Sequence, residues 1–328
     1  MDVILMVFNF IALSIVIQFI IITILIVFDK GKQADPHKNS LHFNELLFDY
    51  KALPAQQTVE ARDGNEMTYR RYSAQSDTVL ILLHGSGWHS QYFLPLATGI
   101  STAGLAEVYT PDLRGHGTMP ARRGDVDYID QLEDDLADFI SYIRKENPNA
   151  KVVVGGHSSG GGLAIRFAGS RYAKLADGYV LLSPFLKYNA PTMRPNSGGW
   201  ANPFTARIIG LSMLNMMRIH CCDFLTVISF NMPKDARDGT ETLRYSHRLN
   251  TAYAPRNYKK DLSTITQPIL VVAGTADEAF IAEQFEPVIS AYTVAQITLL
   301  SGVTHMGVVV GPEVQLTLKT WLDDFNQQ

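Results

Sequence analysis

The chain has 328 residues, of which 46% are hydrophobic and 18% charged, with a formal net charge of −4. This much apolar material can fill a sizeable core, so the composition excludes a disordered chain. Nucleic-acid binding requires positive charge clustered on one face, and the sequence contains no dense tract of lysine and arginine. We therefore expect no nucleic-acid partner.

The two cysteines, Cys221 and Cys222, are adjacent and cannot form the framework of disulfides that holds small secreted domains together. We interpret them as small apolar side chains. The sequence contains no C-x-x-C or H-E-x-x-H pattern, and its nine histidines are scattered. We therefore expect neither a metal site nor a cofactor.

The first segment is an apolar run from Val3 to Phe28 that contains no charged residue. With a rise of about 1.5 Å per residue, a helix of this length reaches across a hydrocarbon core of about 30 Å. We predict a single transmembrane helix over residues 1–29, which would anchor the protein in a membrane. A cleaved signal peptide is the alternative, but Asp2 stands where such peptides carry Lys or Arg, and no A-x-A site follows.

The positive charges nearest to this helix lie after it, at Lys30, Lys32 and Lys38. They favour a cytoplasmic C-terminal domain, although a large folded domain can be translocated against so small a bias. We interpret residues 30–56 as a tether. The folded domain is then expected over residues 57–328.

Beyond the tether, short apolar runs alternate with amphipathic stretches. Two alternating segments around the turn signal at 63–65 are expected to open the sheet. Further strands are predicted at 78–83, 107–110, 151–154, 178–182, 268–273 and 296–300. Helices are predicted at 127–147, 158–169, 279–291 and 313–325. This alternation predicts an α/β fold whose mostly parallel sheet carries helices on both faces.

The alternation of strands and helices is lost between Ser183 and Leu262. Compact domains rarely contain an unstructured loop of this length. We therefore predict that residues 184–262 form an inserted helical cap, packed on the ends of the strands.

A G-x-S-x-G pattern at 156–160 lies between a predicted strand and a predicted helix. Glycines on both sides of Ser158 permit a sharp turn that exposes the serine hydroxyl. Such a hydroxyl needs a base to remove its proton during attack. His305 follows the last predicted strand in a short loop that contains glycine. We predict Ser158 as a nucleophile and His305 as its general base.

Asp277 follows the strand predicted at 268–273 and completes the chain order serine, acid, histidine. Its carboxylate would hold the imidazole in the required tautomer and stabilise the imidazolium formed during attack. Glu278 is the alternative acid, and capping of a helix N-terminus is the alternative role for Asp277.

Attack on an ester or amide carbonyl places negative charge on oxygen, which two backbone N–H groups can stabilise. The predicted donors of this oxyanion hole are Ser159, directly after the nucleophile, and Ser86, in the loop 84–87 that ends a strand. An ordinary strand-ending turn is the alternative interpretation of that loop.

Together these motifs resemble the α/β-hydrolase superfamily, in particular its monoglyceride-lipase and lysophospholipase-like branch, often grouped with serine aminopeptidases. The resemblance spans about residues 57 to 325 and leaves out the apolar helix. It is carried by His84-Gly85-Ser86-Gly87-Trp88-His89-Ser90, Asp112-Leu113-Arg114-Gly115-His116-Gly117, Gly156-His157-Ser158-Ser159-Gly160, Asp277 and His305. It implies the α/β-hydrolase fold, a catalytic triad of Ser158, Asp277 and His305, and oxyanion donors at Ser86 and Ser159. The motif that begins at Asp112 matches a structural loop without a catalytic role.

A membrane anchor and a cap that contains Met213, Met216 and Met217 favour a substrate with an acyl chain. Our first hypothesis is hydrolysis of a lipid ester, such as a monoacylglycerol or a lysophospholipid, through an acyl-enzyme. The methionines are also ordinary core residues, and a short-chain carboxylesterase, an amidase or a peptidase would use the same site. A non-catalytic membrane binding protein on a hydrolase scaffold is the hypothesis of another class, and the complete triad argues against it.

Overall fold

The computed structural model describes residues 2–31 and 41–327. Its largest element is an eight-stranded sheet with the strand order β1-β2-β4-β3-β5-β6-β10-β11. The strands are β1 (Gln57–Glu60), β2 (Glu66–Tyr72), β3 (Thr78–Leu83), β4 (Glu107–Pro111), β5 (Lys151–His157), β6 (Gly178–Leu182), β10 (Ile269–Gly274) and β11 (Gln296–Leu300). The pairs β1–β2 and β2–β4 are antiparallel, and every other neighbouring pair is parallel. The predicted mostly parallel sheet is confirmed.

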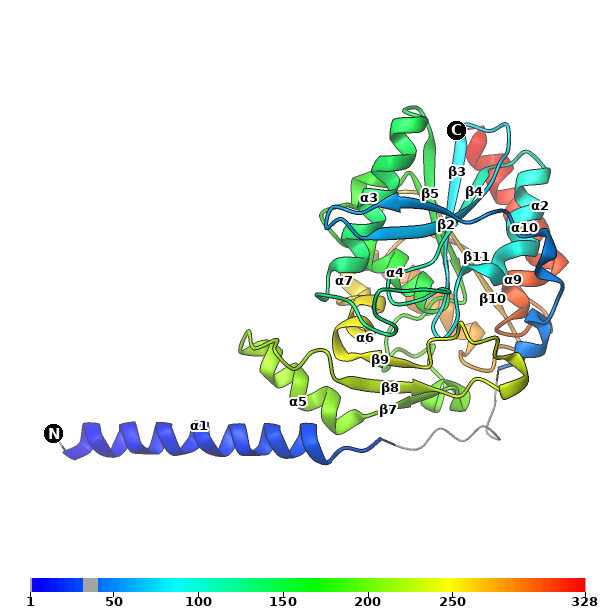
Figure 1. Ribbon diagram of the computed structural model, residues 1–328. Helices are drawn as coiled ribbons and strands as arrows, with labels where there is room; N and C mark the ends of the chain where they lie inside the picture. Colours follow the sequence, from blue (N-terminus) through cyan, green and yellow to red (C-terminus); the bar gives the residue numbers. More distant parts are fainter. Residues whose placement is uncertain (1, 32–40, 328) are drawn as a thin grey trace.

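Helices cover both faces of this sheet (Figure 1). One face carries α2 (Leu94–Thr102), α9 (Gly307–Val310) and α10 (Pro312–Asn326), and the other carries α3 (Gln131–Glu146), α4 (Ser159–Ala168) and α7 (Tyr258–Ser263). The central strands β3, β5, β6 and β10 are buried along almost their whole length. A parallel sheet covered on both faces leaves such strands no side that meets water, which explains their runs of Val, Ile and Leu.

The helix predicted at 279–291 is shorter in the structure. It is reduced to the turn η7 (Ala282–Gln284) and to α8 (Phe285–Ser290). The first residues of the predicted helix instead donate two backbone N–H groups to the Asp277 carboxylate. Other 3₁₀ turns connect the larger elements: η3 (Ser90–Phe93), η4 (Ala173–Leu175), η5 (Pro195–Gly199) and η6 (Lys234–Ala236).

Residues 184–262 contain a second sheet, which corrects the prediction that this segment is helical. Its strands pair antiparallel in the order β7 (Ala201–Pro203), β8 (Thr226–Phe230) and β9 (Arg244–Ser246), beside the helices α5 (Thr205–Met216) and α6 (His247–Tyr253). The sequence of β8, Thr-Val-Ile-Ser-Phe, is rich in β-branched and aromatic residues that favour a strand. Strands this short carry too little periodicity to be distinguished from irregular helix in the sequence alone.

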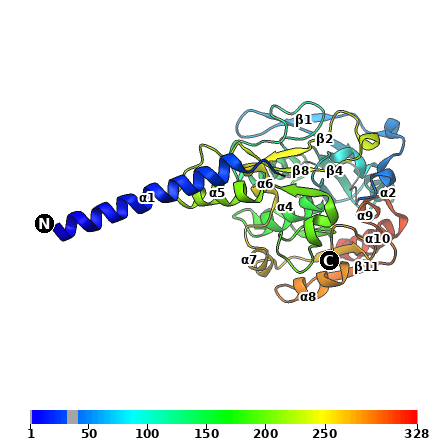
Figure 2. The same ribbon diagram turned by 90° about the horizontal axis from the view of Figure 1, so that it is seen from below.

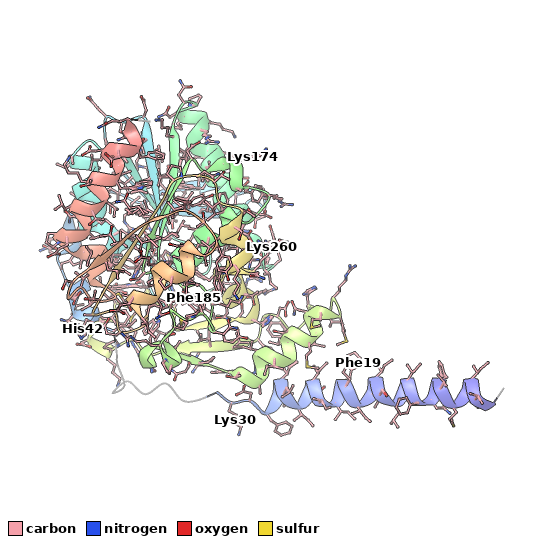
Figure 3. All side chains as sticks on the ribbon, turned by 180° about the vertical axis from the view of Figure 1, so that it is seen from behind. Phe19, Lys30, His42, Lys174, Phe185 and Lys260 are labelled. Atoms are coloured by element: carbon pink, nitrogen blue, oxygen red, sulfur yellow. The ribbon has the colours of Figure 1, made fainter. Side chains whose placement is uncertain are left out.

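The apolar N-terminal run forms a continuous helix, α1 (Asp2–Phe28). By length and composition, it is the one helix among the described residues that could cross a membrane. Most of α1 extends away from the main domain, and Phe19 lies clear of that domain (Figures 2 and 3). Large apolar side chains along this part of α1 are exposed, which is unusual for a surface in contact with water.

The C-terminal part of α1 packs against α5 (Figure 2). Ile22 and Ile26 are buried in a small apolar cluster with Leu211 and Leu214 of α5. Gly210 allows this close approach, because a Cβ atom there would lie 2.8 Å from Ile26 Cγ1.

Arg207, also in α5, closes the end of α1. Its Nε donates to the carbonyl oxygen of Ile26 at 2.9 Å, and its Nη2 donates to that of Asp29 at 2.7 Å. The last carbonyl groups of a helix have no partner within the helix. The arginine therefore supplies donors that the end of α1 lacks, and it fixes α1 to α5.

The packed part of the domain begins before the predicted boundary at Gln57. Leu41, Phe43 and Leu46 belong to the main apolar core, and the chain there forms the turns η1 (Phe43–Leu46) and η2 (Tyr50–Ala52). The predicted tether at 30–56 is therefore too long at its C-terminal end. The polar residues of this stretch suggested a tether, although the apolar residues among them pack in the core. Residues 32–40 of the predicted tether lie outside the described residues.

Arg166 of α4 connects three parts of the domain while its side chain is almost fully buried. It donates to Glu133 of α3 at 2.5 Å and to Asp130 at 2.7 Å. It also donates to the carbonyl oxygens of Thr251 and Ala254, at the end of α6. Helix α4, which directly follows Ser158, is thus fixed to the 184–262 segment.

Replacement of Arg166 by alanine is expected to lower the free energy of unfolding by about 3–5 kcal/mol, because it leaves Glu133 buried with fewer partners. Chemical denaturation of the purified protein would measure this loss. Arg171→Ala is the control, since the Arg171 side chain is exposed where it pairs with Asp134, and it should leave the denaturation midpoint unchanged. Equal effects of the two substitutions would contradict the role given to Arg166.

Candidate active site

Ser158 occupies a sharp turn between β5 and α4. Its φ of 54° and ψ of −117° place a residue with a side chain in a backbone region that favours glycine. The flanking glycines have no alternative in this turn. A Cβ atom at Gly156 would lie 2.3 Å from the carbonyl carbon of Gly160, and one at Gly160 would lie 2.1 Å from the carbonyl oxygen of Leu83. The structure thus has the strand, turn and helix that the G-x-S-x-G pattern predicts.

His305 and Asp277 form a buried hydrogen-bonded pair. His305 Nδ1 lies 2.9 Å from Asp277 Oδ2, and both side chains are almost fully buried. The other carboxylate oxygen, Oδ1, accepts the backbone N–H groups of Ala279 and Phe280 at 2.8 Å each. Asp277 therefore holds the imidazole through one oxygen and the turn that follows it through the other. It does not cap a helix, because the next helical turn, η7, begins only at Ala282, with Ile281 as its N-cap.

The ionised form of Asp277 is favoured in this environment. Burial acts to raise its pKa, but attraction to His305 and the hydrogen bond from that ring outweigh burial and leave the pKa below its usual value. A carboxylate that stays ionised can stabilise positive charge on the imidazole.

Glu278, the alternative acid, makes a different contact. Its Oε2 accepts the backbone N–H of His305 at 2.9 Å, whereas the ring contacts Asp277. The two adjacent acids therefore hold the same histidine by different atoms. Glu278 positions the loop, and Asp277 orients the imidazole.

Ser158 and His305 line the same pocket, together with Ser86. In the part of the chain that the structure describes, the one hydrogen bond of the His305 ring is that to Asp277. The ring and the serine hydroxyl are therefore neighbours without a hydrogen bond between them. Contacts between nucleophile and base are often long in free hydrolases and shorten when substrate binds.

Ser86 and Ser159 meet beside Ser158. Their side-chain oxygens lie 2.7 Å apart, and both residues line a second pocket with Ser158. The amides on each side of Ser86 are occupied, since Gly85 N donates to Tyr92 and Gly87 N donates to Tyr245. Across residues 2–31 and 41–327, the backbone N–H groups of Ser86 and Ser159 have no protein acceptor. These two amides are the donors that an oxyanion would require.

The loop that carries Ser86 is held by a neutral histidine. Burial lowers the pKa of His84 to about 4. Its Nε2 accepts the backbone N–H of Leu113 at 3.0 Å, and its Nδ1 lies 2.9 Å from the carbonyl oxygen of Gly85. Asp112 in the same region accepts the backbone N–H and the hydroxyl of Ser90. The motif that begins at Asp112 thus braces the loop from outside the two pockets.

Sequence reasoning missed several residues of the site. His157, inside the nucleophile motif, lies with its Nε2 3.0 Å from the carbonyl oxygen of His305, and burial lowers its pKa well below the usual value. Tyr92 and Tyr245 hold the two amides that flank Ser86. The position of His157 next to Ser158 in the sequence could have indicated its place in the site. Nothing in the sequence indicates that Tyr245 contacts the loop that carries Ser86.

Two small cavities meet at Ser158. The first has a volume of about 10 Å³ and lies on the side of His305. The second has about 70 Å³ and lies beneath the 184–262 segment. Aromatic and aliphatic side chains from that segment dominate its lining: Phe185, Trp200, Ile228, Phe230, Tyr245 and Tyr253. The 184–262 segment thus supplies much of the wall of the second cavity.

The described residues contain neither a metal-binding cluster nor a disulfide. No group of three or more His, Cys, Asp or Glu side chains within them is placed to hold a metal ion. Cys221 and Cys222 carry free thiols whose sulfur atoms lie 3.7 Å apart.

Comparison with known proteins identifies the class. Residues 74–306 match the serine aminopeptidase S33 family of hydrolases. Because this match covers most of the chain, the protein belongs to that family and is a hydrolase with the α/β-hydrolase fold.

Among individual proteins, human monoglyceride lipase is 26% identical over 251 residues, which cover 74% of this chain and 78% of that enzyme. The fold resembles that of a soluble variant of monoglyceride lipase from Saccharomyces cerevisiae, with a TM-score of 0.67, 19% identity and coverage of 85% of this chain and 98% of that one. It also resembles the monoacylglycerol lipase of Paleococcus ferrophilus, with a TM-score of 0.62, 23% identity and coverage of 79% and 98%. The protein is thus a monoglyceride-lipase-like member of its family.

The contacts of Asp277 and Glu278 predict different effects of substitution. Asp277→Asn is expected to lower kcat for ester hydrolysis by about 10⁴-fold, because the amide disturbs the tautomer and charge balance of the imidazole. Glu278→Gln should cause a much smaller loss, since it alters a contact to the backbone of His305. Steady-state kinetics of both variants would compare them. A larger loss for Glu278→Gln would reverse the assignment of the acid.

Proposed function

We propose that this protein is a membrane-anchored serine hydrolase that cleaves carboxylic esters of lipid character through an acyl-enzyme. The observation that carries the proposal is the Asp277–His305 pair beside Ser158, with the amides of Ser86 and Ser159, which have no protein acceptor among the described residues, in the pockets that Ser158 also lines.

In the proposed mechanism, Ser158 Oγ attacks the ester carbonyl carbon while His305 Nε2 accepts the hydroxyl proton. Asp277 stabilises the resulting imidazolium, and the amides of Ser86 and Ser159 bind the oxyanion. The intermediate collapses, the ester C–O bond breaks, and His305 donates its proton to the leaving alcohol. Water then attacks the acyl-enzyme by the same steps, which releases the carboxylic acid and restores Ser158.

The lining of the larger cavity favours an apolar acyl group. Aromatic and aliphatic side chains of the 184–262 segment surround it, as expected of a pocket for an acyl chain. Met213, Met216 and Met217 do not line this cavity. Met213 and Met217 pack against the cluster between α1 and α5, and Met216 is exposed. The name of the human relative, monoglyceride lipase, supports the same substrate class.

Aminopeptidase activity is the alternative that the family name suggests. An aminopeptidase must recognise a charged amine, and a carboxylate in the site would serve that purpose. Among the described residues, no Asp or Glu lines either cavity at Ser158. The lining of the two cavities therefore favours ester hydrolysis over aminopeptidase activity.

The exposed apolar surface of α1 supports membrane anchoring. The lysines that follow α1 in the sequence favour a catalytic domain on the cytoplasmic side. We expect the full chain to remain with the membrane fraction after an alkaline carbonate wash and to keep residues 3–28 on mass spectrometry. Replacement of Ile15 and Phe19 by arginine should release it, because charge at the centre of a spanning helix is costly. Cleavage after residue 28 in the mature protein would instead indicate a signal peptide.

For the chemistry, we expect a fluorophosphonate probe to label the wild-type protein at Ser158 and to fail with Ser158→Ala. The same variant, and His305→Ala, should reduce turnover of a long-chain monoacylglycerol by several orders of magnitude, with folding intact by circular dichroism.

Matched acetate and palmitate esters of p-nitrophenol would test the acyl group. The wild-type protein should prefer palmitate. Preference for acetate would exclude the lipid substrate, and an unlabelled but folded wild-type protein would favour the hypothesis of a non-catalytic binding protein.

A further inference from the structure

The two cavities at Ser158 can be assigned to the two halves of an ester. His305 lines the first cavity and not the second, whereas Ser159 lines the second and not the first. In acyl transfer the histidine gives its proton to the leaving oxygen, so the alcohol departs on the side of the imidazole. The first cavity then receives the leaving alcohol, and the second, beneath the 184–262 segment, receives the acyl chain.

The wall of the first cavity comes from an unexpected part of the chain. Leu41, Phe43 and Leu46 line it, although they belong to the stretch between the apolar helix α1 and the first strand. All three are at most 2% exposed. The Phe43 ring lies 5.0 Å from that of Trp200, which borders both cavities. With about 10 Å³ left, the cavity has room for about one water molecule.

Polar contacts fix this wall to the catalytic loop. Thr304 Oγ1, next to the catalytic imidazole in the chain, donates to Glu45 Oε2 at 2.7 Å. On the same segment, His42 Nδ1 lies 3.4 Å from Glu278 Oε1. The other oxygen of Glu278 accepts the backbone N–H of His305. His42 itself lies at the edge of the domain (Figure 3). The wall and the proposed base are therefore held in one arrangement.

We infer that residues 41–46 determine which alcohols the enzyme can release, and that they select esters of small, uncharged alcohols over esters with a bulky phosphorylated headgroup. This inference rests on the proposed function. Its basis is steric, because a bulky leaving alcohol must displace more of the buried side chains that line the first cavity than a small one. It is also electrostatic, because the carboxylates of Glu45 and Glu278 lie behind the wall and repel a phosphate. A monoacylglycerol fits this description better than a lysophospholipid.

The test uses the full-length protein in detergent and two substrates that share one acyl chain, a monoacylglycerol and a lysophosphatidylglycerol, whose headgroup carries a net negative charge. Phe43→Ala and Leu46→Ala are expected to raise the ratio of kcat/KM for the lysophospholipid over the monoacylglycerol by about tenfold or more, since removal of several buried methylene-sized groups enlarges the cavity. The preference among acyl chain lengths should stay as in the wild type, because the acyl cavity lies elsewhere.

Leu47→Ala is the matched control, since it removes the same atoms from an adjacent leucine that is 51% exposed. It should leave the ratio unchanged. Labelling of Ser158 by the fluorophosphonate probe checks that each variant is folded. Phe43→Leu, a smaller reduction in volume, provides the same test should an alanine variant unfold.

Two results would overturn the inference while the proposed function stands. One is a ratio within about twofold of the wild type in the folded Phe43 and Leu46 variants, all of which still hydrolyse the monoacylglycerol. The other is a changed acyl-chain preference with an unchanged response to the alcohol. Failure of the folded wild-type protein to hydrolyse any ester would instead reject the proposed function, and the inference with it.

Discussion

The backbone turn at Ser158 is the constraint on which the rest of the site depends. A residue with a side chain held at such a positive φ costs about 1–3 kcal/mol, and the conformation persists only where its surroundings fix it. Here β5 lies between β3 and β6 in the sheet, and α4 is held from its other end by the buried Arg166. Gly156 and Gly160 leave room for strand and helix to meet at this angle. The strain is thus compensated by packing that extends through the whole domain.

Around this turn, each polar group of the site makes a different hydrogen bond. The two oxygens of Asp277 divide between the imidazole and the backbone that follows. Glu278 and His157 bind the backbone N–H and carbonyl groups of His305, which leaves its ring to Asp277 and to the pocket. In a buried site, such contacts matter because an unpaired polar group is costly. They also fix the imidazole before substrate arrives.

The N-terminal part of the chain takes part in both the packing against α5 and the wall of the pocket. Arg207 and Gly210 of α5 hold α1, while Phe43 contacts Trp200 just before β7. Both contacts involve the unit of β7 and α5 within the 184–262 segment. This unit therefore connects the apolar helix with the cavities at Ser158.

The sequence by itself determined the features that depend on local chemistry. The strands of the parallel sheet are continuous apolar runs, α1 is an uninterrupted apolar helix, and the turn at Ser158 needs glycines at fixed offsets, so each can be recognised within a few residues. Chain order and loop position also pointed to the histidine and the acid. Only the tertiary structure showed that Asp277 contacts the imidazole of His305 while Glu278 contacts its backbone, because adjacent acids are equivalent in sequence and differ in which atoms they reach. It alone showed the short strands β7 to β9 and the role of Leu41 to Leu46, since a few apolar residues between polar ones become a pocket wall only where distant segments converge on them.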